Sequence, residues 1–525
     1  MGPVFRACLL LATCAAAVRL CAVEPWGTVL DSSGAPIATL SRTDDRGAAV
    51  LADGELAAGA AAVRFVPGTV RVGRIELADR ALTFFGEGTT LASDGGEAGM
   101  FRLDGADAAH RWTFRDIAFE GPAAGASVPH DGGAIDCRGG GLSLIGCSFS
   151  GLRARFSGGA VTAVAMDGDV VVSNCTFSGN SAGPLNGLGG AIYASGAAEG
   201  TELLIADSRF VGNCAENGGA IATFHVWDET EVPQSVKIVG ATELAENAAL
   251  YQGGAVYAEG PFAASGSNVL FRANVAGNGG GAIAVNGVED LSEPVGVTLA
   301  DGVTFAQNRV VTNVTWTAGG AVCVMKPGCR IDVCRAVFSN NTAKTEHCGE
   351  PAYGGAVYTA EDCTNEFRLT AFVGNDAGNA EKSWCFGGAV SAAGGRTTID
   401  TCVFDCGEMP TEKCYGNAVD FEETETRILN STFRRGRVEA VSAYNGTLSV
   451  TNCVLVGNGA ACDLFVEGTT AFAMGYSAYG GRQLDVGVTV TADDFNLADR
   501  RADDVYDGGT LRLRGSGFNP VAGLG

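Results

Sequence analysis

The chain has 525 residues, of which 77 are glycine and 14 are proline, while 46% are hydrophobic and 18% are charged. This hydrophobic content excludes general disorder as the reason for the glycines, and the lack of a Gly-X-Y period excludes collagen. With 35 basic and 59 acidic residues the net charge is −24, which disfavours binding to nucleic acids and to anionic membranes. A glycine-rich, apolar and acidic composition favours a regularly turning β protein.

The first 23 residues have the pattern of a secretory signal peptide. Arg6 supplies a positive charge, residues 7–18 form an apolar run without an acidic side chain, and the small residues Cys21 and Ala22 precede Glu24. The apolar run is shorter than the ~20 residues that a membrane-spanning helix needs, and no later segment is long and apolar enough to span. We therefore expect export without a transmembrane segment after the signal peptide.

Two short motifs repeat along the chain, and they carry the strongest information in the sequence. Gly-Gly-Ala followed by Ile or Val occurs nine times, at intervals of 26 to 39 residues, and Gly416-Asn417-Ala418-Val419 is a degenerate tenth copy. Between these copies lies Phe-x-x-Asn, as at Phe177 and Asn180. The glycine pairs of the nine copies are Gly132 and Gly133, Gly158 and Gly159, Gly189 and Gly190, Gly218 and Gly219, Gly253 and Gly254, Gly280 and Gly281, Gly319 and Gly320, Gly354 and Gly355, and Gly387 and Gly388.

Each repeat predicts three short strands. After Gly-Gly-Ala the residues alternate with period two, so Ile192, Ile221 and Val256 are expected to point inward in consecutive turns. Residues 170–172 predict a second strand, and residues 175–177 predict a third, with Cys175 and Phe177 inward. Three strands in ~30 residues without a helical period predict a solenoid of parallel strands. The glycines are expected to form tight corners, and the Asn of Phe-x-x-Asn is expected at a corner in left-handed geometry.

These tandem motifs resemble the repeat of chlamydial polymorphic outer membrane proteins, which other bacterial β-helical surface proteins share. The resemblance covers about residues 130–460. It implies an all-β fold with one right-handed parallel β-helix, exported and displayed at the cell surface or associated with the outer membrane, with adhesion as its role. Residues 63–88 resemble the entry of pectate-lyase-like β-helices, residues 44–60 are expected to form a capping helix, and residues 511–517 resemble a closing turn.

We therefore expect one elongated domain. Its parts are a signal peptide at 1–23, an N-terminal cap at 24–62, the β-helix at 63–495 and a closing segment at 496–525. Proteins of the resembled family end in an autotransporter β-barrel of several hundred residues, for which residues 461–525 are too few. The sequence therefore leaves the route of export and anchoring open.

The residues that could support catalysis do not form a recognisable set. Parallel β-helices include pectin- and alginate-degrading enzymes, so the fold alone does not decide the function. The polygalacturonase signatures Asn-Thr-Asp, Gly-Asp-Asp, Gly-His-Gly and Arg-Ile-Lys are absent from the sequence, and Asp136 and Asp420 are interpreted as isolated outward acids. The four histidines are scattered and three of them are expected in loops: His110, His130, His225 and His347.

These observations predict no catalytic residue, no cofactor site and no metal site, with calcium at the acidic turn Asp167-Gly168-Asp169 as an alternative. The predicted function is a secreted or cell-surface scaffold, structural and adhesin-like, whose partner is an unknown surface protein or glycan. The alternative is a polysaccharide-active enzyme, a lyase or hydrolase of the pectate-lyase-like superfamily. The sequence does not indicate an oligomeric state.

Three of the 18 cysteines lie in the predicted signal peptide, so 15 remain, and an odd number cannot pair completely. No Cys-x-x-Cys occurs, which argues against a zinc site. Cys385 and Cys414 each lie two residues before the glycine that opens their motif. These are equivalent loop positions in adjacent turns, ~4.8 Å apart, and they predict a disulfide. Cys348 and Cys406 are rival partners, whereas the cysteines near the inward Phe or Leu are expected as small core residues: Cys147, Cys175, Cys402 and Cys453.

Overall fold

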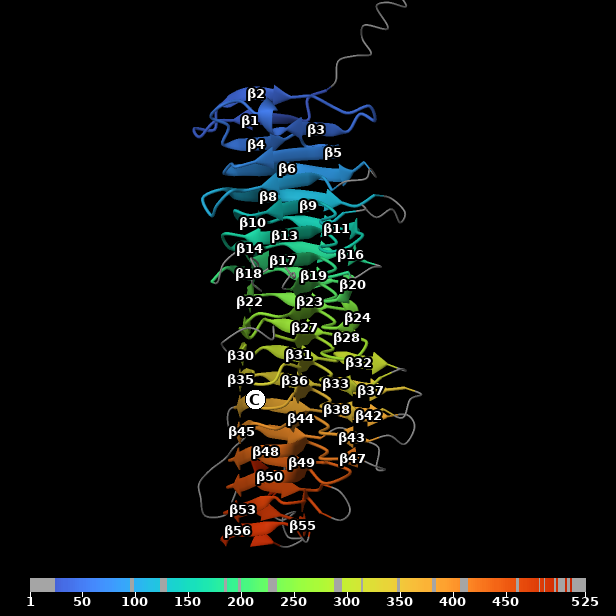
Figure 1. Ribbon diagram of the computed structural model, residues 1–525, viewed down its shortest axis with the longest axis vertical. Helices are drawn as coiled ribbons and strands as arrows, with labels where there is room; N and C mark the ends of the chain where they lie inside the picture. The colour runs from blue at the N-terminus through green and yellow to red at the C-terminus, as the bar shows by residue number, and fades with distance from the viewer. Residues whose placement is uncertain are drawn as a thin grey trace, which may run out of the picture.

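The strands of this chain wind into one long parallel β-helix, which runs along the vertical axis of Figure 1 from the N-terminal to the C-terminal end. A computed structural model describes residues 24–94, 99–122, 130–183, 187–196, 200–224, 234–287, 295–312, 315–346, 350–379, 384–406, 414–458, 462–480, 482–485, 487–494, 497–498, 506–507 and 510–511. The predicted signal peptide and nearly all of the predicted closing turn lie outside these residues.

The all-β, parallel β-helix prediction is confirmed, and its right-handed sense stays a prediction. Each turn contributes one strand to each of three columns, and every strand of a column pairs in parallel with its counterpart in the next turn. The described residues contain no α-helix, and their only helical turn is the 3-10 segment Asp53–Glu55.

From β9 to β44, each strand of the first column comes directly after the Gly-Gly-Ala of its own turn. Ile192, Ile221 and Val256 are aligned in consecutive turns and fully buried, as predicted. The column contains β3 (Ala49–Ala52), β5 (Gly68–Ala78), β7 (Phe101–Asp104), β9 (Ile135–Arg138), β13 (Val161–Met166), β17 (Ile192–Gly196), β21 (Ile221–Thr223), β25 (Val256–Ala258), β29 (Ile283–Val285), β34 (Val322–Val324), β39 (Val357–Thr359), β44 (Val390–Ala393), β48 (Val419–Leu429), β50 (Val441–Thr451), β52 (Leu464–Glu467) and β55 (Arg482–Leu484).

The second column carries the short apolar strands that precede the polar corner. Long strands such as β48 and β50 bend and contribute to both the first and the second column. The second column contains β4 (Ala62–Phe65), β6 (Leu82–Ser93), β8 (Arg111–Glu120), β10 (Gly141–Ile145), β14 (Val170–Ser173), β18 (Glu202–Ala206), β22 (Ser235–Val239), β26 (Phe262–Ser265), β30 (Gly296–Ala300), β35 (Arg330–Cys334), β40 (Thr364–Arg368), β45 (Arg396–Asp400), parts of β48 and β50, β53 (Ala471–Gly475) and β56 (Thr489–Asp494).

The third column carries the inward phenylalanines. Parts of β5, β6 and β8 belong to it, followed by β11 (Ser148–Ser150), β15 (Thr176–Ser178), β19 (Arg209–Val211), β23 (Glu243–Ala245), β27 (Leu270–Arg272), β31 (Thr304–Ala306), β36 (Val337–Ser339), β41 (Ala371–Val373), β46 (Val403–Asp405), β49 (Thr432–Arg434), β51 (Val454–Val456), β54 (Ala478–Tyr479) and β57 (Leu497–Ala498).

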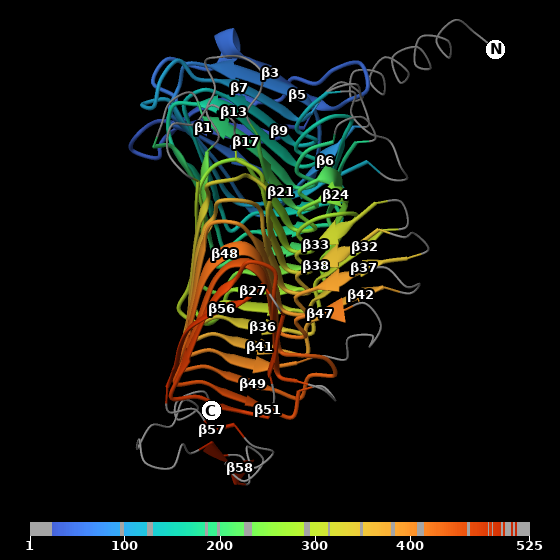
Figure 2. The ribbon, with the colours of Figure 1, turned by 60° about the horizontal axis from the view of Figure 1, so that its bottom comes forward.

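Two short sheets lie at one side of the coil, between the third column and the next glycine pair, as Figure 2 shows. One contains β12 (Arg153–Ala154), β16 (Ser181–Ala182), β20 (Cys214–Asn217), β24 (Ala248–Gln252), β28 (Val275–Ala276), β32 (Arg309–Thr312), β37 (Thr342–Thr345) and β42 (Asp376–Asn379). The other contains β33 (Thr317–Ala318), β38 (Ala352–Tyr353), β43 (Cys385–Phe386) and β47 (Cys414–Tyr415). A separate hairpin pairs β58 (Tyr506–Asp507) with β59 (Thr510–Leu511).

The N-terminal end is closed by strands, and the predicted capping helix over residues 44–60 is wrong. This segment contains β3 and the 3-10 turn, and β3 already pairs in parallel with β5. The antiparallel strands β1 (Gly27–Leu30) and β2 (Pro36–Leu40) cover the first turn through the pairing of β1 with β4. The apolar alternation of β3, with Ala49 and Leu51 buried, favours a strand over a helix here.

The two glycines of each corner are required for different reasons. The first glycine has φ between +57° and +66°, a region that other residues rarely adopt. The second does not, but a Cβ on Gly254 would overlap the carbonyl oxygen of Gly281 in the next turn, and the same holds for Gly190 against Gly219. Corner geometry therefore explains only the first glycine, and close stacking of neighbouring turns explains the second.

Phenylalanine rings form a stack through the core. Phe271, Phe305 and Phe338 stack with ring centroids 4.8 Å apart and planes within 8°. Leu244 interrupts the stack between Phe210 and Phe271, because it occupies the phenylalanine position of its own turn. Aromatic rings at this spacing bury large apolar areas in register, which stabilises each turn on its neighbour.

The asparagines of Phe-x-x-Asn form a second internal ladder. Asn274 Nδ2 donates to the Leu244 carbonyl oxygen at 2.9 Å and to Asn308 Oδ1 at 2.9 Å, while its Oδ1 accepts from the amide and side chain of Asn247. Members of this ladder are almost fully buried: Asn180, Asn213, Asn247, Asn274, Asn308, Asn341 and Asn375. The prediction of left-handed geometry at the Asn is wrong, since the residue before it has positive φ, as at Gly179 and Ala273.

Replacing one ladder asparagine should destabilise the protein strongly. In Asn274→Ala the Leu244 carbonyl and the Asn247 amide lose buried hydrogen bonds, so the free energy of unfolding should fall by roughly 3 kcal/mol. The matched control is Asn268→Ala, because Asn268 is exposed in the same turn. Urea denaturation followed by circular dichroism measures both, and equal losses in the two variants would contradict a structural role for the ladder.

Candidate functional site

The side chains that point outward from the first column are buried although they face away from the core. Thr162, Tyr193 and Tyr257 are at most 5% exposed. The segment before each glycine pair covers them, because the chain turns sharply at the first glycine. Thus the Thr162 hydroxyl donates a 2.9 Å hydrogen bond to the Ser157 carbonyl oxygen across the corner. The outward side chains of the first column form one side of a strip, and the segments that precede the glycine pairs form the other. We call this strip the corner groove.

The middle of the corner groove is filled by apolar side chains. Tyr193, Ala222, Tyr257 and Ala284 pack together there against Val164, Leu188 and Phe224. The Tyr257 hydroxyl donates to Glu259 Oε1 at 3.2 Å and accepts from Asn286 Nδ2 at 3.2 Å. The groove is therefore closed in these turns, and it opens toward either end of the coil.

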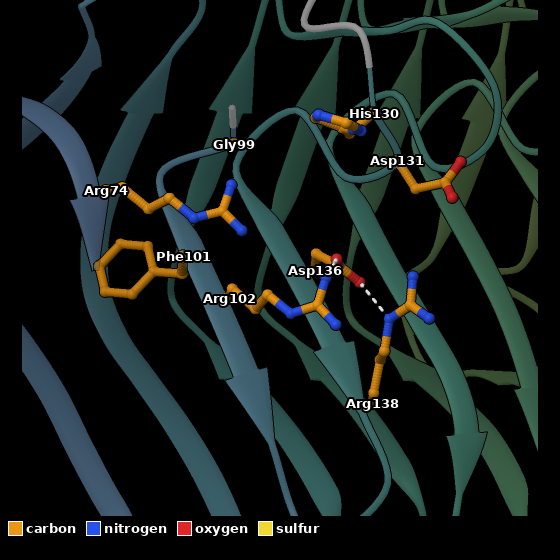
Figure 3. A pocket seen from close by; sticks show the side chains of 8 residues that line it. All are labelled: Arg74, Gly99, Phe101, Arg102, His130, Asp131, Asp136 and Arg138. Carbon is orange, nitrogen blue, oxygen red and sulfur yellow. Dashed lines mark hydrogen bonds and ion pairs between the residues drawn. The ribbon is translucent and has the colours of Figure 1, made fainter. Parts of the chain in front are cut away.

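Toward the N-terminal end the corner groove contains a cavity of about 110 Å³, the arginine pocket, shown in Figure 3. Strands β5, β7 and β9 present its basic side chains, and the segment before the first glycine pair closes it from the other side. The lining residues are Arg74, Gly99, Phe101, Arg102, His130, Asp131, Asp136 and Arg138.

Asp136 is the buried centre of the arginine pocket. Burial raises the pKa of its carboxyl group, which the neighbouring guanidinium groups of Arg138 and Arg102 partly oppose. Arg102 Nη1 lies 3.3 Å from Asp136 Oδ2, and Arg138 Nε lies 3.4 Å from Oδ1. Because Arg74 also pairs with Glu76, the arginines already have acidic partners, and the pocket is a salt-bridge network.

Toward the C-terminal end the corner groove opens into a larger cavity of about 420 Å³, which we call the acidic cavity. Its floor comes from the first column, where Ser391, Asp420 and Ser442 are aligned in three consecutive turns. The residues that line the cavity are Met325, Pro327, Tyr353, Tyr358, Ala360, Glu361, Ser391, Ala392, Ala393, Asp420 and Glu422.

Carboxylates concentrate at this end of the groove. Asp420 is buried, and this burial raises its pKa to about 8, with Glu422, Glu439 and Glu467 adding repulsion and a Ser442 hydrogen bond opposing the rise. Burial also raises the pKa of Glu439, whose Oε1 accepts a 3.2 Å hydrogen bond from the Gly416 amide. The interpretation of Asp420 as an isolated acid is therefore wrong, because the coil brings four carboxylates together from three turns.

An aromatic row starts at Tyr353, which lines the acidic cavity, and continues along the sheet of β38, β43 and β47. The rings of Tyr353 and Phe386 stack 5.1 Å apart, and those of Phe386 and Tyr415 stack 5.8 Å apart, each pair within 12° of parallel. Trp384 stacks on Tyr415 at 5.6 Å and is 43% exposed. Because these rings lie face to face, they cover one another, and of the row only Tyr353 lines the cavity beside the acidic residues Glu361, Asp420 and Glu422.

The sequence analysis missed this site for two reasons. Tyr353, Phe386 and Tyr415 each stand directly before the glycine that opens their motif, a column that becomes visible only when the repeats are aligned. Glu439 occupies the position of the second corner glycine, in Val438-Glu439-Ala440-Val441, a copy too degenerate to recognise. What this copy retains of the motif is the pair Ala440-Val441, which could have identified it in an alignment of the repeats.

The predicted disulfide partners lie next to each other, but on strands. Cys385 of β43 pairs in register with Cys414 of β47, so the equivalent positions are confirmed and the expected loop geometry is wrong. Both are buried with Ala352 and Ala377. The hydrogen bond that the Cys414 thiol donates to Cys385 raises the pKa of Cys414. The disulfide itself stays a prediction, and its rival partner Cys348 lies outside the described residues.

The remaining cysteines expected in the core are buried there, namely Cys147, Cys175, Cys402 and Cys453. Cys147 and Cys175 lie in adjacent turns and share a side-chain hydrogen bond, which raises the pKa of Cys175. Cys329 and Cys363 form a second such pair, in which the pKa of Cys363 is raised.

The acidic turn considered for calcium bonds to neighbouring backbone. Asp167 Oδ2 accepts from the Gly140 amide and Asp169 Oδ1 from the Glu202 amide, each at 3.1 Å. Within the described residues no three His, Cys, Asp or Glu side chains are grouped so as to hold a metal ion. Calcium at this turn stays a prediction. Of the four histidines, His225 and His347 lie outside the described residues.

Two segments of the repeat region match a known family. A family model of the Chlamydia polymorphic membrane protein repeat matches residues 174–195 and 335–360. The chain carries polymorphic membrane protein repeats. Each matched segment runs from the third column to the next Gly-Gly corner, as from Phe338 through Asn341 to Gly354 and Gly355. No curated protein and no solved structure matches the chain.

The matched family indicates a β-helix protein associated with the outer membrane or the cell surface. Among the residues that the structure describes, no helix has the length and apolar character required to cross a bilayer.

The first prediction from this region concerns the thiols. Non-reducing peptide mapping of the exported protein should recover a peptide linked through Cys385 and Cys414, since export permits oxidation and the two are nearest neighbours on paired strands. Cys147 and Cys175 serve as a comparison, because they are a core pair for which we expect free thiols. Alkylation of both Cys385 and Cys414 without prior reduction would contradict the prediction.

The second prediction concerns Asp420. Since its pKa in the folded state is about 8 and its usual value is 3.8, its contribution to stability is greatest at low pH and is lost as the pH rises from about 4 to about 8. Asp420→Asn should remove this loss. The free energy of unfolding of the variant, relative to that of the native protein, should therefore be higher at pH 9 than at pH 5, on the order of a few kcal/mol. Denaturation curves at both pH values measure the effect. The exposed Asp45→Asn is the control, and parallel pH profiles for the native protein and Asp420→Asn would contradict the assignment.

Proposed function

We propose that this protein is an exported, right-handed β-helix scaffold of the cell surface, adhesin-like, which binds a partner surface protein or glycan along the corner groove. The signal-peptide pattern and the polymorphic membrane protein repeats at 174–195 and 335–360 support export and surface display. The Phe and Asn ladders support a rigid rod that presents outward side chains at fixed spacing.

The observation that carries this proposal is the corner groove. It follows the glycine corners from Asp136 in β9 to Asp420 in β48, and it opens into a cavity toward each end. The closed middle of the groove separates the two cavities, and their linings differ, so each suits a different group of the partner, with charge complementarity setting partner choice.

A second candidate function is hydrolysis of a glycan at the acidic cavity. Glycoside hydrolases use two carboxyl groups, and the acid catalyst has a raised pKa so that it holds its proton near neutral pH. Asp420 has this property, with Glu422, Glu439 and Glu467 nearby. This arrangement favours a hydrolase more than it favours a polyuronide lyase, because no basic side chain is among the residues that line the acidic cavity.

The scaffold function predicts surface exposure and binding without turnover. Antibodies against the β-helix should label intact cells that express the protein, and protease treatment of those cells should remove the label. Purified protein should release neither reducing nor unsaturated ends from pectate, alginate, xylan or chitin. Asp420→Asn is the matched control in every turnover assay.

The two candidate functions give different results in these assays. Turnover that disappears in Asp420→Asn would overturn the scaffold proposal and establish the hydrolase. A label found only inside cells, after their permeabilisation, would overturn the surface assignment.

A further inference from the structure

The arginine pocket contains hydrogen-bond donors that its own salt bridges leave unused. Arg74 pairs with Glu76 through Nε. Arg138 pairs with Asp136 through Nε. Within the described residues, the two terminal nitrogens of both arginines therefore have no acceptor. Arg102 uses Nε and Nη1 for acidic partners, which leaves its Nη2 without one. The salt bridges thus position the three guanidinium groups but do not saturate them.

The same pocket contains acceptors that lack donors. Asp136 is only 8% exposed, and its Oδ1 is buried and accepts no hydrogen bond from the described residues. Arg138 Nε lies 3.4 Å from this oxygen as an ion pair. Asp131 provides a second acceptor, because the described residues use only its Oδ1, which accepts from the Ser157 amide at 2.7 Å. A buried acceptor without a hydrogen bond costs free energy, which a donor on a ligand would recover.

These groups surround one small space. Strands β7 and β9 are paired in register, which brings side chains of adjacent turns together. Figure 3 shows the guanidinium groups of Arg74, Arg102 and Arg138 around this space, with His130 and Asp131 on its other side. The cavity of about 110 Å³ is well below the ~300 Å³ of pockets that enclose a drug-sized molecule. It therefore admits one charged group at the end of a ligand, and a polymer chain cannot pass through it.

The surroundings of the arginine pocket repel an anion less than the rest of the chain does. Residues 61–160 contain ten arginines and eleven acidic residues, whereas the whole chain has a net charge of −24. The exposed Arg155 lies beside the pocket, because its amide donates to the His130 carbonyl oxygen at 3.3 Å. A single anionic group can therefore approach here with little repulsion, whereas a polyanion along the rod would meet the acidic turns that follow.

The combination of unused donors and unused acceptors discriminates between kinds of anion. Guanidinium groups with free terminal nitrogens form bidentate hydrogen bonds with a carboxylate. An acidic amino-acid side chain or an inorganic sulfate would satisfy these donors, but it would bring no donor to Asp131 and Asp136 and would repel both. A carboxylated sugar satisfies both sets, because the hydroxyl groups next to its carboxylate donate hydrogen bonds. A neutral sugar would leave the guanidinium groups without an anionic partner.

We propose that the arginine pocket binds the terminal sugar of an acidic glycan through the carboxylate of that sugar. This inference rests on the proposed scaffold function and names a glycan as the partner at this end of the corner groove. The carboxylate lies between Arg74 and Arg138, and the neighbouring hydroxyl groups donate to Asp131 and Asp136. Arg102 keeps Asp136 in place through its 3.3 Å contact and contributes Nη2 to the ligand.

The test compares acidic sugars with their neutral counterparts. The acidic probes are sialyllactose and glucuronyl-galactose, each of which ends in a carboxylated sugar, and the neutral counterparts are lactose and glucosyl-galactose. Binding to the exported protein is measured by isothermal titration calorimetry at physiological salt. We expect at least one acidic probe to bind at least about tenfold more tightly than its neutral counterpart, because only the acidic probe forms charge-assisted hydrogen bonds with the arginines.

Two variants and a matched control locate the binding in the arginine pocket. Arg74→Gln should weaken binding of the acidic probe about tenfold, because it removes a bidentate donor. Arg396→Gln should change it less than about twofold, since Arg396 forms a similar ion pair with Glu425 in a distant turn. Asp131→Asn should weaken it about threefold through the loss of a hydroxyl acceptor, whereas a site for a simple anion would bind more tightly without that charge. Circular dichroism confirms that each variant is folded.

The outcomes separate this inference from the proposed function. Equal binding of both acidic probes and their neutral counterparts, an equal loss in Arg396→Gln, or tighter binding in Asp131→Asn would overturn the inference. Tighter binding of sulfated lactose than of either acidic probe would overturn the carboxylate, and tighter binding of a peptide that alternates glutamate and serine would overturn the glycan. Failure of surface labelling, by contrast, would overturn the scaffold function whatever the sugars do.

Discussion

The close stacking of neighbouring turns at the Gly-Gly corner is the constraint on which the rest of this structure depends. At the second glycine the backbones of adjacent turns approach so closely that a Cβ on Gly254 would overlap the Gly281 carbonyl oxygen. This approach keeps the parallel strands in register from turn to turn. Register in turn allows the Phe rings to stack at 4.8 Å and each buried Asn amide to bond the next. The corner motif and the core ladders are thus one cooperative arrangement.

The acidic cavity ends at the turn in which this constraint is first released. Asn417 replaces the second corner glycine in the tenth copy, and Glu439 replaces it in the turn after that. Once the corner carries a side chain, a carboxylate can enter the corner groove, and the Gly416 amide stabilises it with a hydrogen bond. The cluster around Asp420 therefore arises from the loss of the motif. In the turns of β17 to β29 the same strip is filled by Tyr193, Tyr257 and small residues.

The inward half of the molecule could be predicted from the sequence, because one constraint repeats in every turn. The alternation after Gly-Gly-Ala identified Ile192, Ile221 and Val256 as core residues, and Phe-x-x-Asn marked the third column. The role of the Asn was misread, since left-handed geometry is a local property and its ladder bonds join separate turns. Asp420 was misread for the same reason. Its partners Glu439 and Glu467 are 19 and 47 positions away, and only the pitch of the coil brings them together.

This division between repeated and unrepeated positions has a consequence for how such a rod acquires specificity. A residue in an inward ladder is held by identical neighbours above and below, so a change there costs stability in three turns at once. An outward residue of the corner groove is held by one hydrogen bond or one ring contact, as Thr162 is by Ser157. Chemical variety is therefore tolerated along the groove and excluded from the core. The two cavities fit this division, since the arginine pocket lies at the first corner and the acidic cavity reaches the first degenerate corner, at Gly416 and Asn417. A ligand that contacts both ends would have to follow the apolar middle of the groove, where Tyr193 and Tyr257 leave no open space, so each cavity must select its own ligand group.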